Sequence, residues 1–146
     1  MEIFINLAFS YLAAAGFGII LNVPRKAING CGCVGALGWG VYKIVMALHG
    51  GMVLSNLTAA LMIGVSSIFI ARFKKMPMIL FNIPSLVPLV PGGQAYRAVQ
   101  NFAFGNNNQA IVYLVQVTLI AGSIAMGFFL AELLARLYFG FRNGKN

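Results

Sequence analysis

The chain has very little negative charge, and this shortage argues against an enzyme. Only two of its 146 residues are acidic, Glu2 and Glu132, and they stand far apart in the sequence. General acid–base catalysis by paired carboxylates is therefore excluded, and the sequence shows no nucleophile beside a suitable base either. We expect no enzymatic activity and no catalytic residues.

Cysteine and histidine are also scarce, which argues against a metal centre or a bound cofactor. Cys31 and Cys33 are separated by one glycine, too few and too close for a disulfide framework. Zinc needs four protein ligands, or three and a water molecule, whereas the single histidine, His49, lies about eighteen positions beyond Cys31. We expect the cysteines to be small packing residues. We expect His49 to lie in a solvated turn, with a role in proton coupling as the alternative.

Charged residues of either sign are rare, and this rarity excludes a soluble domain. They make up 8% of the chain, and hydrophobic residues make up 60%, whereas soluble domains carry roughly 25% charged residues. Four long stretches carry no formal charge, namely 3–23, 44–71, 76–96 and 98–131. Each is near or above the ~18–20 residues that span a ~30 Å hydrocarbon core. The sequence therefore predicts an integral membrane protein in contact with the lipid bilayer.

Five membrane-spanning helices account for these stretches, and the fourth is broken. The predicted spans are roughly 3–21, 27–48, 52–71, 76–104 and 109–137. In the fourth, Pro84, Pro88 and Pro91 prevent a continuous helix, and Gly92 and Gly93 permit positive φ and close approach of a ligand or another backbone. The predicted fold is a single all-α transmembrane domain over residues 1–146. A broken membrane helix is a common feature of transport sites.

The positively charged residues lie in short clusters between the apolar stretches. With five crossings, eight of the ten fall on one side of the membrane, and these are Arg25, Lys26, Arg72, Lys74, Lys75, Arg136, Arg142 and Lys145. The positive-inside rule then places the N-terminus outside and the C-terminus inside. We interpret the net charge of +8 as a topology signal and expect no nucleic-acid partner. No basic segment precedes the first span, so we expect it to be retained rather than cleaved as a signal peptide.

One motif in the broken span resembles a known family. Pro88, Pro91, Gly92 and Tyr96 match the pattern P-x-x-P-G-x-x-x-Y, and Asn-Val-Pro at 22–24 closes the first span. With these motifs, and with a glycine-bearing second span, the chain resembles the ThrE-type threonine/serine exporters over nearly its whole length. It is most similar to the small, C-terminal-half-like subunit of the split two-component form.

The resemblance implies a subunit of a secondary exporter in the bacterial cytoplasmic (inner) membrane. It implies export of small polar acids driven by the proton-motive force: threonine and serine, or a dicarboxylate such as succinate. It also implies a larger ThrE-like partner subunit, with which this chain would work by alternating access. Two alternatives stay open, a homo-oligomeric pore formed by self-association and a membrane scaffold that transports nothing.

The candidate substrate site lies at the break. If a helix restarts near Gln94, the free amides after Gly92 and Gly93 favour an anion. Arg97 would add a charge-assisted hydrogen bond to a carboxylate, with Pro88, Pro91 and Tyr96 lining the cavity. The alternative is a structural kink, with Arg97 reaching the headgroups.

Two other ionisable residues lie in or near the predicted spans. Lys43, within the second span, either faces the pathway or extends to the outer interface. Glu132 is expected to pair with Arg136 four residues later on one helix. We interpret that pair as structural.

Overall fold

The computed structural model describes the backbone of residues 2–143 and the side chains of residues 3–138. All regular secondary structure in this part of the chain is helical, as predicted. Arg142 and Lys145, counted above among the inner cations, lie outside the described side chains. The elements in chain order are α1 (Glu2–Ile20), α2 (Arg25–Ala47), α3 (Gly51–Lys74), α4 (Ile79–Leu86), the short 3₁₀ helix η1 (Val87–Leu89), α5 (Gly92–Ala103) and α6 (Asn107–Asn143).

Four of these helices, α1, α2, α3 and α6, are long and apolar enough to cross a membrane. A shorter apolar helical stretch, Ile79–Leu89, covers α4 and η1. The helices match the predicted spans to within a few residues, except that α6 continues to Asn143 where the sequence predicted an end near 137. The number of crossings and the orientation in the membrane stay predictions.

Helix α2 lies at the centre of the bundle and contacts α1, α3, α4 and η1. Its buried glycines allow these contacts, because a Cβ atom there would collide with neighbouring helices. A Cβ on Gly35 would lie 2.6 Å from the Cβ of Ala14 in α1, and one on Gly30 would lie 2.8 Å from the Phe81 ring in α4. Small residues at such spacing let membrane helices approach closely. The predicted central position of this span is confirmed.

One end of the bundle gathers basic residues. The ammonium group of Lys74, at the end of α3, donates a hydrogen bond to the carbonyl of Lys26, near the start of α2. Helix α3 ends at Lys74, and the next residue, Lys75, adopts a left-handed conformation with φ 53°. The first two predicted basic clusters therefore lie at the same end of the fold, which we call the basic end.

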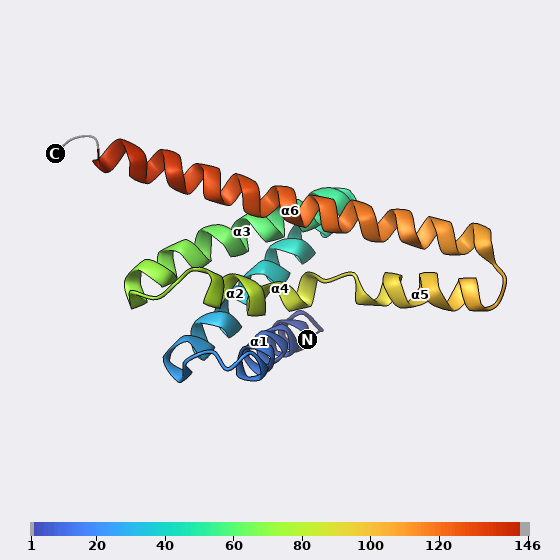
Figure 1. The fold of residues 1–146 in the computed structure, drawn as a ribbon, viewed down its shortest axis with the longest axis horizontal. Coiled ribbons are helices and arrows are strands. Elements are labelled where there is room, and N and C mark those ends of the chain that lie inside the picture. The colour runs from blue at the N-terminus through green and yellow to red at the C-terminus, as the bar shows by residue number, and fades with distance from the viewer. Residues whose placement is uncertain (1, 144–146) are drawn as a thin grey trace.

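Helix α6 packs on α3 and also on α5 (Figure 1). Its 37 residues extend about 55 Å at 1.5 Å per residue. Figure 1 shows the later part of α6 crossing α3, while its first part runs beside α5 beyond the other helices. Among the described elements, α5 contacts α6 alone, whereas α4 contacts α1, α2 and α3. The two sides of the broken segment thus have different surroundings.

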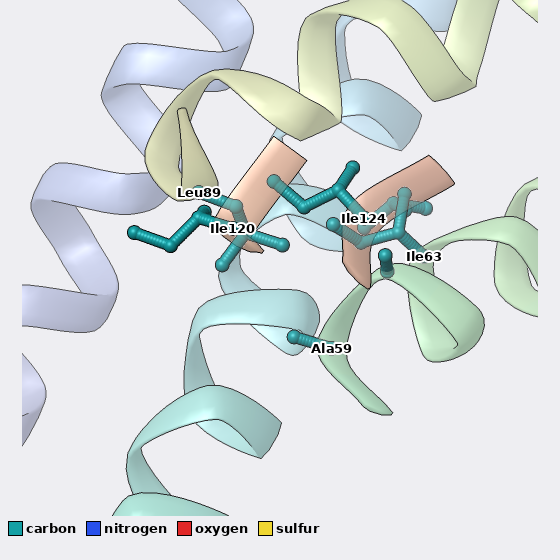
Figure 2. Packing of buried hydrophobic residues seen from close by; sticks show 7 residues of the cluster. Ala59, Ile63, Leu89, Ile120 and Ile124 are labelled. Atoms are coloured by element: carbon teal, nitrogen blue, oxygen red, sulfur yellow. The ribbon is translucent and has the colours of Figure 1, made fainter. Parts of the chain in front are cut away.

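The bundle is held together by an apolar group of residues from α2, α3, η1 and α6, which we call the central cluster. Figure 2 shows Leu89 of η1 beside Ile120 of α6, with Ile124 and Ile63 adjacent. The full cluster is Val34, Ala59, Ala60, Ile63, Leu89, Ile120 and Ile124. Because Leu89 belongs to it, the residues just before the break are anchored in the core.

Candidate transport site at the helix break

Pro88 and Pro91 break the fourth apolar segment as predicted, whereas Pro84 was wrongly predicted to do so, because it lies inside α4 (Ile79–Leu86). Pro88 and Pro91 have no amide hydrogen, so neither can continue a ladder of helical hydrogen bonds. Val90 is extended, with φ −62° and ψ 128°, and the amide of Gly92 donates to the carbonyl of Val90 at 2.8 Å. Two residues, Val90 and Pro91, therefore separate the end of η1 from the start of α5.

The glycine pair begins the helix that follows the break. Glycine permits positive φ at 92 and 93, but neither residue adopts it: the described glycines with positive φ are Gly51 and Gly105. Gly92 and Gly93 instead begin α5 directly after Pro91, two residues before Gln94. A Cβ at either position would meet nothing within 4 Å. Their lack of side chains leaves open space around the start of α5.

The start of α5 presents free backbone donors. Pro91 caps the helix without a side-chain hydrogen bond, and the first helical bond within reach is from the Ala95 amide to the Pro91 carbonyl, 3.0 Å. The amides of Gly93 and Gln94 have no acceptor in the described part of the chain. Unpaired amides at a helix start carry partial positive charge and attract anions.

A cavity of about 160 Å³ adjoins this helix start, and we call it the break cavity. Of the residues predicted for the site, it brings together Pro88, Pro91 and Gln94. The remaining lining residues come from α2, α3, η1, the break and α6, and they are Trp39, Tyr42, Met52, Asn56, Leu89, Val90 and Ile120. Met52 is the second residue of α3, so the cavity lies toward the end of the bundle opposite the basic end.

Asn56 contributes a buried polar group to this cavity. Its side chain is 3% exposed, and its Nδ2 donates to the Met52 carbonyl at 2.8 Å. A side-chain amide can form more hydrogen bonds than this one, because its oxygen accepts as well. Asn56 is therefore suited to contact a polar ligand in the break cavity.

Trp39 adds an aromatic wall and an unused donor. Its ring stacks on Tyr42, with centroids 5.2 Å apart, and the Lys43 ammonium lies 5.5 Å from the Trp39 ring centroid. The indole Nε1 is buried without a hydrogen-bond partner among the described residues. Sequence reasoning did not select Trp39 or Asn56. The sequence did indicate them in one respect, because each carries a hydrogen-bonding side chain within an apolar span.

The other predicted site residues lie outside the cavity lining. Tyr96 is 68% exposed, and Arg97 is exposed with its guanidinium 5.9 Å from the Tyr113 ring centroid on α6. Arg97 still follows Gln94 by three residues, so the two share one face of α5. Lys43 does not line the cavity, and its ammonium group lies over the ring of Trp39, which does.

Two further sequence predictions concern polar residues away from the break. Arg136 donates to the Glu132 carboxylate at 2.6 Å, and both side chains are mostly exposed, so the predicted pair on α6 is confirmed. His49 is exposed in the turn that follows α2, with φ 60°. A solvated turn histidine is what the sequence predicted.

Comparison with known proteins places the chain in a family. Residues 6–134 match the family model described as "Threonine/Serine exporter, ThrE". An uncharacterized protein from Haemophilus influenzae is 26% identical over 143 residues, covering 92% of this chain and 48% of the relative. The chain thus spans about half the length of the curated relative that it matches. No solved structure matches. Because the family model covers most of the chain, including the proline motif, the protein belongs to the ThrE threonine/serine exporter family.

Proposed function

We propose that this chain is one membrane half of a secondary exporter of threonine and serine in a bacterial cytoplasmic membrane. The observation that carries the proposal is the break cavity, where the free amides of α5 adjoin Asn56 and Gln94. Its volume of about 160 Å³ is well below the ~300–1,000 Å³ of pockets for drug-sized ligands. A cavity of this size suits a small amino acid.

The substrate carboxylate would bind at the start of α5. The Gly93 and Gln94 amides are unpaired donors there, and the helix dipole adds to their attraction for an anion. The indole N–H of Trp39 is a further donor that has no partner among the described residues. Arg97 and Lys43 would raise the local concentration of anions near the site without touching the bound substrate.

The substrate hydroxyl would contact the side-chain amides of the cavity. Asn56 and Gln94 both donate and accept hydrogen bonds, so either can pair with a hydroxyl group. Leaving such buried groups unpaired is costly, and this penalty discriminates against analogues that lack the hydroxyl. Pro88 and Pro91 would keep the backbone open at this position.

A larger membrane partner would complete the transporter. The chain spans about half of its curated relative, and transporters commonly place the substrate between two repeats. The exposed start of α5, with open space around Gly92 and Gly93, leaves room for such a partner. Alternating access would then occur by movement of the two halves around the break.

Export assays on cells test this proposal. Cells would express this chain alone, the larger family-type subunit alone, or both, and intracellular threonine, serine and succinate would be followed after loading. We expect export of threonine and serine from the pair only. Export by this chain alone would contradict the two-subunit arrangement, and export of succinate instead would contradict the amino-acid substrate.

A matched pair of variants tests the site itself. Asn56→Leu should reduce threonine export by about tenfold, since a buried hydrogen bond to a charged or polar ligand contributes about 1.5 kcal/mol. Thr58→Val changes a residue of the same helix whose hydroxyl bonds to its own backbone, so it should leave export unchanged. Equal export by both variants would exclude the break cavity as the substrate site.

A further inference from the structure

A second cavity lies between α3, α4 and α6, with a volume of about 340 Å³. It extends from Met78, at the start of the α4 region, to Leu86, and it includes Phe128 and Glu132 of α6. The backbones of α4 and α6 do not pack closely against each other in the described part of the chain, and the cavity lies between them. We call it the α4–α6 cavity.

Most of the lining is apolar, but two acceptors are present. The Oδ1 atom of Asn82 is buried and has no hydrogen-bond partner in the described part of the chain. The Glu132 carboxylate receives one hydrogen bond, from Arg136 to Oε1, and a carboxylate has capacity for several more. The unpaired polar groups of this cavity are therefore acceptors, whereas Trp39 contributes an unpaired donor to the break cavity.

The two cavities are separated by a single apolar layer. Leu89 and Ile120 of the central cluster line the break cavity. Leu86 and Phe128 pack against the same cluster and line the α4–α6 cavity. Figure 2 shows Leu89 and Ile120 in contact within this layer. A molecule that passed from one cavity to the other would have to displace these side chains.

We propose that the α4–α6 cavity binds the ammonium group of the substrate amino acid on the basic side of the membrane. The proposal rests on the proposed function, and it adds a second substrate site that precedes the break cavity. An ammonium group supplies three donors, which can satisfy Asn82 Oδ1 and the free oxygen of Glu132. The same carboxylate repels a dicarboxylate, so the cavity would select amino acids over acids such as succinate.

The basic end would attract the carboxylate of the amino acid, the second charged group of a zwitterion. Arg136 is paired with Glu132, and α3 ends nearby with Arg72, Lys74 and Lys75. Their positive charge favours the carboxylate of the amino acid at the mouth, while the ammonium group enters. An analogue without the amino group would still be attracted to the basic end through its carboxylate. It would have no ammonium group to pair with Asn82 and Glu132.

Binding stoichiometry separates the two cavities. The full chain in lipid nanodiscs would be titrated with labelled L-threonine and with 3-hydroxybutyrate, which is threonine without its ammonium group. Equilibrium dialysis counts all bound ligand. Fluorescence of Trp39, the single tryptophan, reports the break cavity that it lines. We expect threonine to bind at two sites per chain and 3-hydroxybutyrate at one.

Variants then assign the second site. Glu132→Gln and Asn82→Leu should each reduce threonine from two equivalents to one while the Trp39 titration stays unchanged. Arg136→Ala breaks the ion pair but keeps the carboxylate, so it should retain both equivalents. If Glu132→Gln does not fold, Asn82→Leu alone decides, because it removes a buried acceptor without a partner.

The outcomes distinguish this inference from the proposed function. Two equivalents of threonine in both variants, or equal stoichiometry for threonine and 3-hydroxybutyrate, would overturn the ammonium site. A Trp39 signal that does not respond to threonine would instead overturn the proposed site at the break. In that case, loss of bound threonine in Glu132→Gln would still support the α4–α6 cavity.

Discussion

Replacing Gly127 with alanine tests how closely α6 packs on α3. A Cβ at this position would lie 2.5 Å from the Leu57 carbonyl oxygen, 2.8 Å from the Ala60 Cβ and 3.0 Å from the Leu61 amide nitrogen. Two of these three atoms belong to the backbone of α3, which cannot rotate away as a side chain can. Gly127→Ala must therefore push the two helices apart.

The size of the effect follows from two opposing contributions. Overpacking of a close contact costs about 1–3 kcal/mol, whereas alanine in place of glycine within a helix contributes about 1 kcal/mol. Gly122, five residues earlier on α6, is the matched control, because a Cβ there meets nothing within 4 Å. We expect Gly122→Ala to gain the helical contribution and Gly127→Ala to be about 1–3 kcal/mol less stable than that control.

Reversible unfolding in mixed detergent micelles gives the required comparison. Both variants would be titrated with a denaturing detergent and followed by helical circular dichroism, with the wild-type chain as reference. We expect Gly122→Ala to be the most stable, followed by wild type and then Gly127→Ala. Wild type and Gly127→Ala would be nearly equal in stability if the gain in helix propensity offsets the cost of overpacking. Equal stability of the two alanine variants would refute the close packing of α3 and α6.

Two further predictions concern polar contacts. Ser85→Ala removes a buried hydrogen bond from the Ser85 hydroxyl to the Cys31 carbonyl, 2.9 Å, which joins α4 to α2; we expect a loss of about 1 kcal/mol, measured by the same unfolding titration. Glu132→Gln removes an exposed ion pair on one helix, and we expect unfolding to change by no more than about 0.5 kcal/mol.

The predictions for Ser85→Ala and Glu132→Gln can each be contradicted by a specific result. Ser66→Ala changes a half-buried serine on α3 and should shift stability by less than about 0.5 kcal/mol. If Ser66→Ala lowers the free energy of unfolding as much as Ser85→Ala does, the hydrogen bond from Ser85 to the Cys31 carbonyl makes no specific contribution to stability. If Glu132→Gln unfolds far more easily than expected, the carboxylate has a structural role that the exposed pair with Arg136 does not explain.

The features that could be predicted from the sequence depend on local chemistry. Pro88 and Pro91 have no amide hydrogen and cannot continue a helix, so the break was predictable, although Pro84 is accommodated inside α4. Glu132 and Arg136 are four residues apart, and that spacing brings them together on any helix. The buried glycines of α2 likewise predicted a central helix, because only a closely packed helix uses many small residues in a membrane.

The features that could not be predicted depend on how distant helices pack. Trp39 and Asn56 line the break cavity because α2 and α3 bring them beside Pro88 and Pro91, and no local pattern encodes that position. The restart of α5 at Gly92 depends on the turn at Val90 and Pro91. The pairing of α5 with α6 alone is also a tertiary property, because it depends on how the helices pack and not on a local pattern.

Helix α6 is uninterrupted and connects two parts of the fold, because it packs on both α3 and α5. Its later part is held on α3 at Gly64 and Gly127, and its first part carries α5, with Arg97 against Tyr113. A tilt of α6 about its contact with α3 would move the start of α5 relative to Leu89, which packs with residues of α2 and α3 in the central cluster. The two residues of the break, Val90 and Pro91, would act as the hinge. The break cavity would then change shape as α5 and α6 move together.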